Sequence, residues 1–216
     1  MSEAMQEAPV AQLNRFSQAA AEELASRFEE FLLARQPTVD GIPTLWFSRE
    51  HIVRVLSVLR SESFAGARFE MLFDLTAIDE RLRVNRTGQP ASDFTVVYHL
   101  MSFGGNGDLR LKVPLQDSDL HLPTVCDLWP NANWYEREAW DMFGIRFDGH
   151  PNLYRLVLPP TWEGHALRKE HPARATEMEP FSLDDAQTDV EQEALKFKPE
   201  EWGMKRASED AEFMFL

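Results

Sequence analysis

The sequence contains one cysteine, Cys126, in 216 residues. A single thiol cannot form a disulfide within the chain, and it cannot hold an iron–sulfur cluster alone, because such clusters are bound by several protein ligands. We therefore expect a cytosolic chain that carries no cluster of its own.

Long apolar runs and clusters of basic residues are missing too. No stretch approaches the roughly 18–20 apolar residues of a membrane-spanning helix, and residues 1–15 lack the basic-then-apolar order of a secretory signal. The net charge of −14 and the lack of a basic stripe argue against a nucleic-acid partner. The acidity instead favours solubility or a basic protein partner.

The familiar motifs of catalysis and metal binding are absent as well. The six histidines follow no ligand spacing, and neither HExxH nor CxxC occurs. Residues 104–108 are glycine-rich but lack the lysine and the following helix of a phosphate-binding loop, so they are typical of a hairpin turn. The sequence also shows no nucleophile elbow and no dinucleotide fingerprint. We expect neither a metal nor a cofactor in this chain.

What the sequence does have is enough apolar residues, 44%, to form a core. Its length suits one domain with an appendage. Apolar residues at helical spacing predict two helices: the first ends near Gln36–Pro37, because a residue before proline avoids helical geometry, and the second is capped by Ser48. The predicted buried faces are Leu24, Phe28, Phe31 and Leu32 in the first helix and Ile52, Val55, Leu56 and Leu59 in the second.

Strands are predicted from short apolar or alternating runs. Residues 44–48 form one such run, while residues 94–103 and 108–115 flank the glycine-rich turn and predict a hairpin. Alternation places Phe69, Met71, Phe73 and Leu75 on one face of a further strand, turns Leu109, Leu111 and Val113 to the core, and turns Arg110 and Lys112 to water. The predicted fold class is α+β: a two-layer domain with a mixed, largely antiparallel sheet over residues 1–147.

Two segments are predicted to contact other surfaces. Residues 81–93 are long for a connection between strands, and such loops are often interaction sites. Residues 148–216 are rich in proline and lack periodic apolar residues, so they cannot bury much of their own surface. We expect an extended C-terminal docking tail with one short helix over residues 182–197. The aromatic residues that favour its contact with another surface are Trp162, Phe181, Phe197 and Trp202.

The helix predicted over residues 134–143 is rich in charge. Asn133 is a good N-cap, Glu136 stands at the capping-box position, and Gly144 suits the left-handed residue that ends a helix. The predicted buried face is Tyr135, Ala139, Met142 and Phe143.

The charges of this helix allow two interpretations. Glu136 and Glu138 suggest the acid–base pair of an enzyme, but two residues along a helix turn side chains about 200° apart, so the pair cannot share a substrate atom. Asp141 lies near the C-terminus of the helix, where the helix dipole disfavours an anion. A residue that is locally unfavourable usually interacts with a group that is distant in the sequence. We therefore expect Asp141 to accept hydrogen bonds from a basic group, Arg155 or Arg168.

The last third of the chain gives two further signals. Residues 165–175 are the most basic segment, and they form either a solvated loop or a clamp on an acidic partner. The chain stops on four apolar residues, whereas natural termini are usually polar, so we expect either a piece of a longer polypeptide or an end that inserts into a neighbour.

Residues 136–157 resemble the signature of the 30 kDa subunit family, also called the C subunit, of proton-pumping NADH:quinone oxidoreductase, respiratory complex I. The family pattern has Glu-Arg-Glu, two further residues, an acid with two apolar residues, and a His or Lys after six more. The matching residues are Glu136, Arg137, Glu138, Asp141, Met142, Phe143 and His150. Tyr154 departs from the Lys, Arg or Pro usual at its position, which leaves Arg155 as the candidate for a salt bridge. The likeness covers at least residues 69–216.

The resemblance implies a scaffold subunit in the hydrophilic arm of the complex, on the cytoplasmic side of a bacterial inner membrane, and associated with the membrane only through the complex. It implies no flavin or cluster in this chain, with FMN and iron–sulfur clusters in partner subunits that pass electrons from NADH to quinone, coupled to proton translocation. The chief partner would be the D subunit, which some bacteria fuse to the C subunit; residues 198–216 resemble such a junction.

The resemblance also implies roles for individual residues. Those expected to fix the corner between the domain (1–147) and the tail (148–216) are Glu136, Arg137, Glu138, Asp141 and His150. Those expected to dock the partner are Arg155, Arg168, Lys169, His171 and Arg174.

Two rival interpretations remain. One is a free-standing hydrolase that uses acids near Glu138, which turnover by the isolated chain would favour. The other is an adaptor unrelated to respiration, which a complex without flavin and iron would favour.

Overall fold

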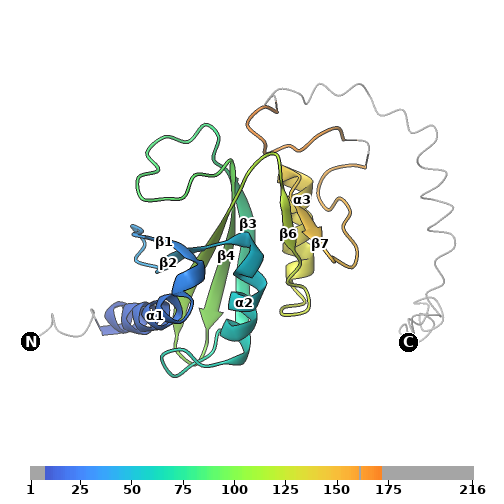
Figure 1. Ribbon diagram of the computed structural model, residues 1–216. Helices are drawn as coiled ribbons and strands as arrows, with labels where there is room; N and C mark the ends of the chain where they lie inside the picture. The colour runs from blue at the N-terminus through green and yellow to red at the C-terminus, as the bar shows by residue number, and fades with distance from the viewer. Residues whose placement is uncertain (1–7, 161, 172–216) are drawn as a thin grey trace, which may run out of the picture. The chain divides into compact units, whose positions relative to one another are not determined.

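A mixed five-stranded sheet forms the frame of the structure (Figure 1). The computed structural model describes residues 8–160 and 162–171. The strands stand in the order β1-β2-β5-β4-β3; β2 and β5 run parallel, and the other neighbouring pairs are antiparallel. A second sheet pairs β6 with β7 in parallel. The strands are β1 (Leu32–Gln36), β2 (Thr44–Phe47), β3 (Met71–Asp79), β4 (Phe94–Ser102), β5 (Gly107–Leu115), β6 (His121–Pro123) and β7 (Arg146–Asp148).

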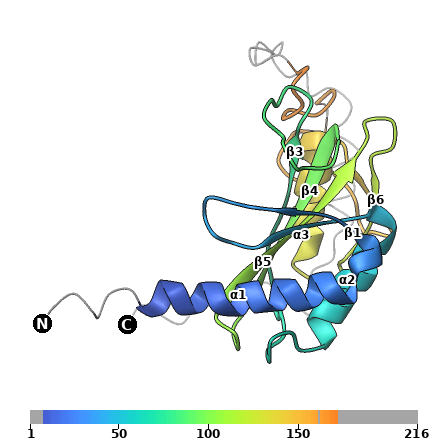
Figure 2. The ribbon, with the colours of Figure 1, turned by 60° about the vertical axis from the view of Figure 1, so that its left-hand side comes forward.

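The helices pack against the main sheet. They are α1 (Ala8–Arg27), α2 (Ile52–Ser61) and α3 (Ala132–Phe143), with short 3-10 turns η1 (Glu29–Phe31) and η2 (Arg49–His51). Buried residues of all three α-helices share one hydrophobic cluster with the inward side chains of β3, β4 and β5. Figure 2 shows α1 crossing the sheet with α2 next to its C-terminal end. Arg27, the last residue of α1, pairs with Glu62, which follows α2, at 2.7 Å. The predicted α+β class with a mixed, largely antiparallel sheet is confirmed.

The strand predictions for residues 44–48, 94–103 and 108–115 are confirmed by β2, β4 and β5. Within the described part of the chain, no helix is long and apolar enough to cross a membrane. The helix predicted over residues 182–197 lies outside the described residues.

The first helix ends earlier than its spacing predicts. α1 stops at Arg27 and residues 32–36 form β1, so the predicted end near Gln36–Pro37 is wrong. Leu24 and Phe28 are buried as predicted. β1 pairs antiparallel with β2, which gives the backbone groups of residues 32–36 hydrogen-bond partners that local spacing does not reveal.

The second helix has the predicted buried face but not the predicted cap. Ile52, Val55, Leu56 and Leu59 are all buried in α2. Ser48 instead precedes the 3-10 turn η2, which lies between it and the helix, and its side chain makes no capping hydrogen bond.

Strand β3 is present as predicted, but its alternation is interrupted. The pairing register with β4 shifts between Leu72 and Asp74, which marks a bulge. Phe73 is consequently 47% exposed while Leu72 and Leu75 are buried. The strand predicted from the alternation is therefore present, but Phe73 and Leu75 do not lie on one face of it.

Lys112 corrects the prediction for the outer side of β5. Leu109, Leu111 and Val113 face the core as predicted, yet Lys112 is only 6% exposed. Its amino group donates a hydrogen bond to Gln36 Oε1 at 3.1 Å and lies over the ring of Trp46. Burial lowers the pKa of Lys112. The side chain does not face water because β1 and β2 supply these partners.

The turn between β4 and β5 explains why glycine occurs there. A Cβ atom at Gly105 would lie 2.2 Å from the ring of Phe16 on α1. The backbone N–H of Gly105 also donates to Ser102 Oγ at 3.1 Å. The close approach of α1 to this turn therefore requires a residue without a side chain.

Replacing Gly105 by alanine should lower the free energy of unfolding by about 1–3 kcal/mol, because the Phe16 ring must move to admit the methyl group. Urea denaturation of the purified chain measures the loss. Gly104→Ala is the matched control, since its Cβ would lie at 3.3 Å from Ala67 Cβ and should cost less. Combining Gly105→Ala with Phe16→Ala should cost less than the sum of the two single changes; strict additivity would contradict the steric explanation.

Candidate functional site

Helix α3 is held against the edge of the main sheet by hydrogen bonds as well as by packing. Its side chains and those just before it donate to backbone oxygens of β3 and the residue preceding it. The bonds are Trp129 Nε1 to Glu70 O (3.1 Å), Asn131 Nδ2 to Leu72 O (2.7 Å) and Tyr135 Oη to Phe73 O (3.1 Å). They occupy acceptors that an edge strand leaves unpaired, and so fix α3 relative to the sheet.

The start of α3 differs from the prediction. The helix begins at Ala132, so Asn133 lies inside it and is not its N-cap. A hydrogen-bonded turn precedes the helix, since Ala132 N donates to Trp129 O at 2.9 Å. The side chain of Asn131, the residue at the N-cap position, makes no capping hydrogen bond because it is used on β3.

Glu136 binds the segment before the helix and not the start of the helix itself. It is fully buried and accepts hydrogen bonds from Thr124 Oγ1 (2.6 Å) and Val125 N (2.7 Å), with a longer one from Cys126 Sγ (3.5 Å). The capping-box prediction is therefore wrong. Burial raises the pKa of Glu136, although the bonds from Thr124 and Val125 act in the opposite direction.

Glu138 takes no part in a carboxylate pair. Its side chain is exposed, whereas Glu136 is buried two residues earlier in the same helix. Within residues 8–160 and 162–171, Glu138 has no hydrogen bond or ion pair. The two acids do not converge on a common point, so the acid–base centre of a hydrolase is not assembled here.

Asp141 is the centre of the site. Its carboxylate is fully buried, and one oxygen accepts hydrogen bonds from three successive backbone N–H groups of Leu156 (3.0 Å), Val157 (2.8 Å) and Leu158 (2.9 Å). The other oxygen pairs with Arg155 at 2.6 Å. Burial alone would raise the pKa of Asp141, but these hydrogen bonds outweigh it and hold the pKa below its usual value.

Arg155 extends this contact along the chain that follows α3. We call the described residues 149–160 and 162–171 the strap. Besides Asp141, Arg155 donates to the carbonyls of Trp162 (2.8 Å) and Gly164 (2.9 Å). Of the two partners expected for Asp141, Arg155 is confirmed. Arg168 binds elsewhere.

Arg137, one helical turn before Asp141 on α3, also binds the strap. It is 5% exposed, and its Nε and one terminal nitrogen donate to the carbonyls of Tyr154 and Arg155, both at 3.3 Å. Its guanidinium lies over the ring of Tyr154 at 3.7 Å and over that of Trp134 at 5.1 Å. The middle residue of the Glu-Arg-Glu triplet therefore binds the backbone of the strap.

The strap caps the C-terminal end of α3. Gly144 has φ 81°, the left-handed geometry predicted for it. His165 Nδ1 donates to Asp141 O at 3.0 Å and Arg168 Nε donates to Phe143 O at 2.7 Å, which satisfies carbonyls that a helix end leaves free. A Cβ at Gly144 would lie 2.6 Å from His165 Nε2, so this contact also requires glycine.

His150 stands beside Glu136 and Cys126, and one possible ligand atom from each lies within 4.8 Å of the others. Their atoms are already used: His150 Nδ1 accepts from Asn152 N at 3.0 Å while Nε2 donates to Asn133 O at 3.2 Å. Burial raises the pKa of the Cys126 thiol to about 11, which opposes the thiolate that a metal needs. Cys126 donates to Glu136, and His150 bonds backbone groups of Asn133 and Asn152, so the polar atoms of all three residues already have partners within the chain.

The far end of the strap is tied to the end of β3. Lys169 N donates to Asp79 Oδ2 at 2.8 Å, and Asp79 also pairs with Arg81, which in turn pairs with Glu170. Arg168 lies near Asp117 and Glu170, at 3.4 and 3.5 Å. His171 packs its ring against Trp162 at 5.4 Å, and Arg174 lies outside the described residues. Of the residues predicted to dock a partner, Arg155 and Arg168 thus bind groups of their own chain.

Sequence reasoning missed three members of this site: Asp79, Arg81 and Thr124. An acid followed two residues later by arginine is a weak local signal. The partner of Asp79 at residue 169 is ninety residues away along the chain. Only the fold brings them together.

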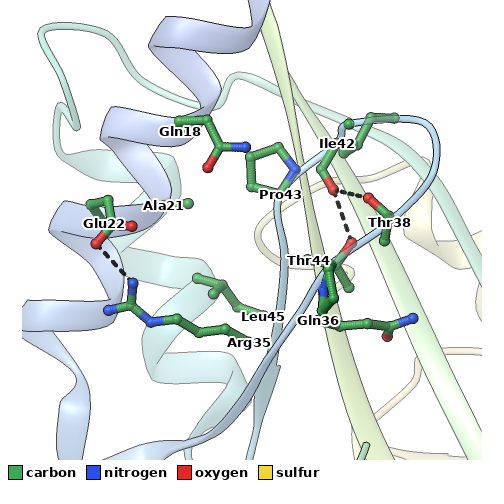
Figure 3. A pocket seen from close by; sticks show the side chains of 12 residues that line it. Gln18, Ala21, Glu22, Arg35, Gln36, Thr38, Ile42, Pro43, Thr44 and Leu45 are labelled. Carbon is green, nitrogen blue, oxygen red and sulfur yellow. Dashed lines mark hydrogen bonds and ion pairs between the residues drawn. The ribbon is translucent and has the colours of Figure 1, made fainter. Parts of the chain in front are cut away.

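A cleft lies elsewhere, between α1 and the turn that joins β1 to β2 (Figure 3). Its volume is about 420 Å³, it is open to solvent, and both polar and apolar residues line it. The charged side chains that line it are paired with each other, since Arg35 binds Glu22 at 2.7 Å. The hydroxyl groups of Thr38 and Thr44 both donate to Ile42 O. No cluster of free nucleophile, base and acid is found in this cleft among the described residues.

Of the four charged side chains of α3, Arg137 and Asp141 bind the strap, Glu136 binds the segment before the helix, and Glu138 is exposed. The site of this α+β domain is thus a set of contacts that joins two segments of the chain to one helix. The family model of the 30 kDa subunit of respiratory-chain NADH dehydrogenase matches residues 45–177. The chain belongs to this family.

Curated relatives agree. The chain is 58% identical over 193 residues to the C/D subunit of NADH-quinone oxidoreductase from Methylococcus capsulatus, a match that covers 89% of this chain and 32% of the relative. It is 55% identical over 194 residues to the C/D subunit from Pseudomonas aeruginosa, covering 90% and 32%. The chain thus spans about a third of the length of these relatives.

Two solved structures are similar as well. The trypsin-resistant fragment (1–134) of Nqo5 has a TM-score of 0.53 and 29% identity, over 63% of this chain and 98% of the fragment. An archaeal membrane-bound sulfane sulfur reductase structure has a TM-score of 0.55 at 18% identity, over 78% of this chain and 96% of that one, a likeness in fold alone.

Substituting Asp141 by asparagine should destabilise the domain by about 3–5 kcal/mol, because it removes one partner of a buried ion pair and turns an amide toward N–H donors. Urea denaturation at neutral pH measures the change. Glu138→Gln on the same helix is the control and should stay within about 0.5 kcal/mol of the wild type. Equal stability of the two variants would contradict the role given to Asp141.

Asp79 gives a prediction for pH. Burial would raise its pKa, but hydrogen bonds from Arg81 and from the backbone of Lys169 lower it to about 2, below the ordinary 3.8. A lowered carboxyl pKa stabilises the fold above the ordinary value, and this stabilisation is lost as pH falls from 3.8 toward about 2. Urea denaturation across this range should show a steeper loss for the wild type than for Asp79→Asn, which starts less stable at neutral pH. Parallel pH profiles would rule out this contribution.

Proposed function

We propose that the chain is a non-catalytic structural subunit of the peripheral arm of an NADH:quinone oxidoreductase. In this role it binds neither FMN nor an iron–sulfur cluster. Partner subunits hold those cofactors and pass electrons from NADH to quinone, coupled to proton translocation. The complex holds the chain at the cytoplasmic side of a bacterial inner membrane.

The observation that carries this proposal is the anchoring of the strap by Asp141. Family membership indicates the complex. The buried carboxylate with three N–H donors supports a structural role within it, because it fixes the backbone path of residues 156–158 against α3. A surface enzyme has no need of such a joint, whereas a subunit that must reach a neighbour does.

The partner in this proposal is chiefly the D subunit, to which the chain is joined in one polypeptide. Relatives named as C/D subunits support this, because the chain matches about a third of their length and leaves room for a second part. Lys169, His171 and Arg174 remain the proposed docking residues. Arg155 and Arg168 have their acceptors on the chain itself, so we assign them to fixing the strap.

The rival functions have less support. A hydrolase needs convergent acid and base groups, and Glu136 and Glu138 do not converge. An adaptor outside respiration would share the fold but not the association with flavin and iron.

Affinity purification of the tagged chain from detergent-solubilised membranes tests the proposal. We expect the eluate to contain flavin and iron together with NADH:quinone oxidoreductase activity, while the chain purified alone shows none of these. An untagged strain is the control for carry-over. Recovery of the chain in a complex without flavin and iron, or turnover of a substrate by the isolated chain, would overturn it.

A further inference from the structure

Two large aromatic side chains remain exposed at the corner between α3 and the strap. Trp134 on α3 is 59% exposed and Tyr154 on the strap is 49% exposed. Both rings face the guanidinium of Arg137, which is almost completely buried between them. Tryptophan, tyrosine and arginine are the residues most enriched where protein–protein binding energy is concentrated.

Arg137 differs in its charge balance from Arg155 and Arg168, the two half-buried arginines of the strap. Arg155 has the carboxylate of Asp141, and Arg168 has Asp117 and Glu170. Within the described part of the chain, Arg137 has no carboxylate within ion-pair distance.

The hydrogen bonds of Arg137 do not replace a counterion. They go to two carbonyl oxygens, each at 3.3 Å, the long end of the range for N–H donors. A guanidinium has five N–H donors, and a buried charge without a partner is costly. The lack of a carboxylate in a chain of net charge −14 is therefore a specific feature of this position.

Rigidity favours a preformed binding surface. Trp134 belongs to a helix fixed to β3, and Tyr154 precedes the residue whose side chain binds Asp141. Neither ring needs to be ordered when a partner arrives, which lowers the entropic cost of association.

We propose that Trp134, Arg137 and Tyr154 form a socket that receives an aspartate or glutamate side chain of the D subunit. The carboxylate supplies the missing counterion of Arg137, and the two rings cover its aliphatic part and exclude water. This inference rests on the proposed function, which supplies the partner. The D subunit is the occupant because relatives carry it on the same polypeptide, which holds it at a high effective concentration near the corner.

The test uses the complex isolated from solubilised membranes of cells that make the full polypeptide. The photo-reactive amino acid p-benzoylphenylalanine replaces Trp134, and mass spectrometry identifies the cross-linked peptide. We expect a peptide from the D subunit that contains aspartate or glutamate, whether that subunit is fused or separate. The same amino acid at Phe103, 64% exposed in the β4–β5 turn, is the matched control and should not give that peptide.

Variants supply the second measurement. Trp134→Ala and Tyr154→Ala should each lower the yield of flavin- and iron-containing complex at least fivefold, whereas Tyr154→Phe and Phe103→Ala should leave it unchanged. Urea denaturation of each purified variant chain checks that folding is retained, and only variants that fold as the wild type does are scored.

The outcomes separate the two proposals. A wild-type chain recovered without flavin and iron refutes the proposed function. A wild-type complex of normal composition overturns the socket alone if residue 134 cross-links only to its own domain, or to a peptide without an acidic residue. Yields for Trp134→Ala and Tyr154→Ala that match Phe103→Ala also overturn it.

Discussion

The buried carboxylate of Asp141 is the constraint on which the corner depends. An anion near the C-terminal end of a helix is opposed by the helix dipole, and burial adds a second cost. Three successive N–H groups of residues 156–158 and the guanidinium of Arg155 compensate both. Helix and strap therefore depend on each other: without the strap the carboxylate would lose all four of these donors, and without Asp141 the strap would lose the acceptor that sets its backbone conformation.

The Glu-Arg-Glu triplet distributes its three side chains in three directions. Glu136 holds the segment before the helix, Arg137 holds the strap after it, and Glu138 faces solvent. One turn of α3 thus joins the segment before the helix to the segment after it. The triplet is a joint, and its acids are not a catalytic pair, because their separation along the helix sends them to opposite sides.

The basic residues of the strap point to the same division of roles. Arg155, His165 and Arg168 all bind backbone or carboxylate groups of their own chain. They set the position of the strap on the domain. Three of the basic side chains that the sequence shows in residues 155–171 are thus engaged within the chain.

Local pattern predicted those features whose causes are local. The core face of α2, the strands at residues 44–48 and 94–103, and the left-handed Gly144 follow from spacing and backbone geometry. The partner of Asp141 could be predicted for a different reason: an acid that the helix dipole opposes indicates a compensating basic group elsewhere in the fold.

The remaining features have causes that are distant in the sequence. Residues 32–36 are expected to end a helix whose apolar spacing runs from Leu24 to Leu32, but they form a strand because β2 offers hydrogen bonds. Lys112 alternates toward water but is buried because Gln36 and Trp46 come from other strands. In both cases a tertiary partner outweighs a local preference.

The contact between Asp141 and residues 155–158 specifies the path of the backbone more than it raises the free energy of unfolding. A buried ion pair is often no more stabilising than well-packed apolar side chains of the same volume. Apolar packing, however, tolerates several arrangements, whereas a carboxylate with three N–H donors and an arginine fixes one backbone path. The strap is poor in buried apolar side chains, so hydrogen bonds are the means by which its course can be specified. The arrangement around Asp141 therefore specifies the backbone path of residues 156–158 more than it adds to the stability of the fold.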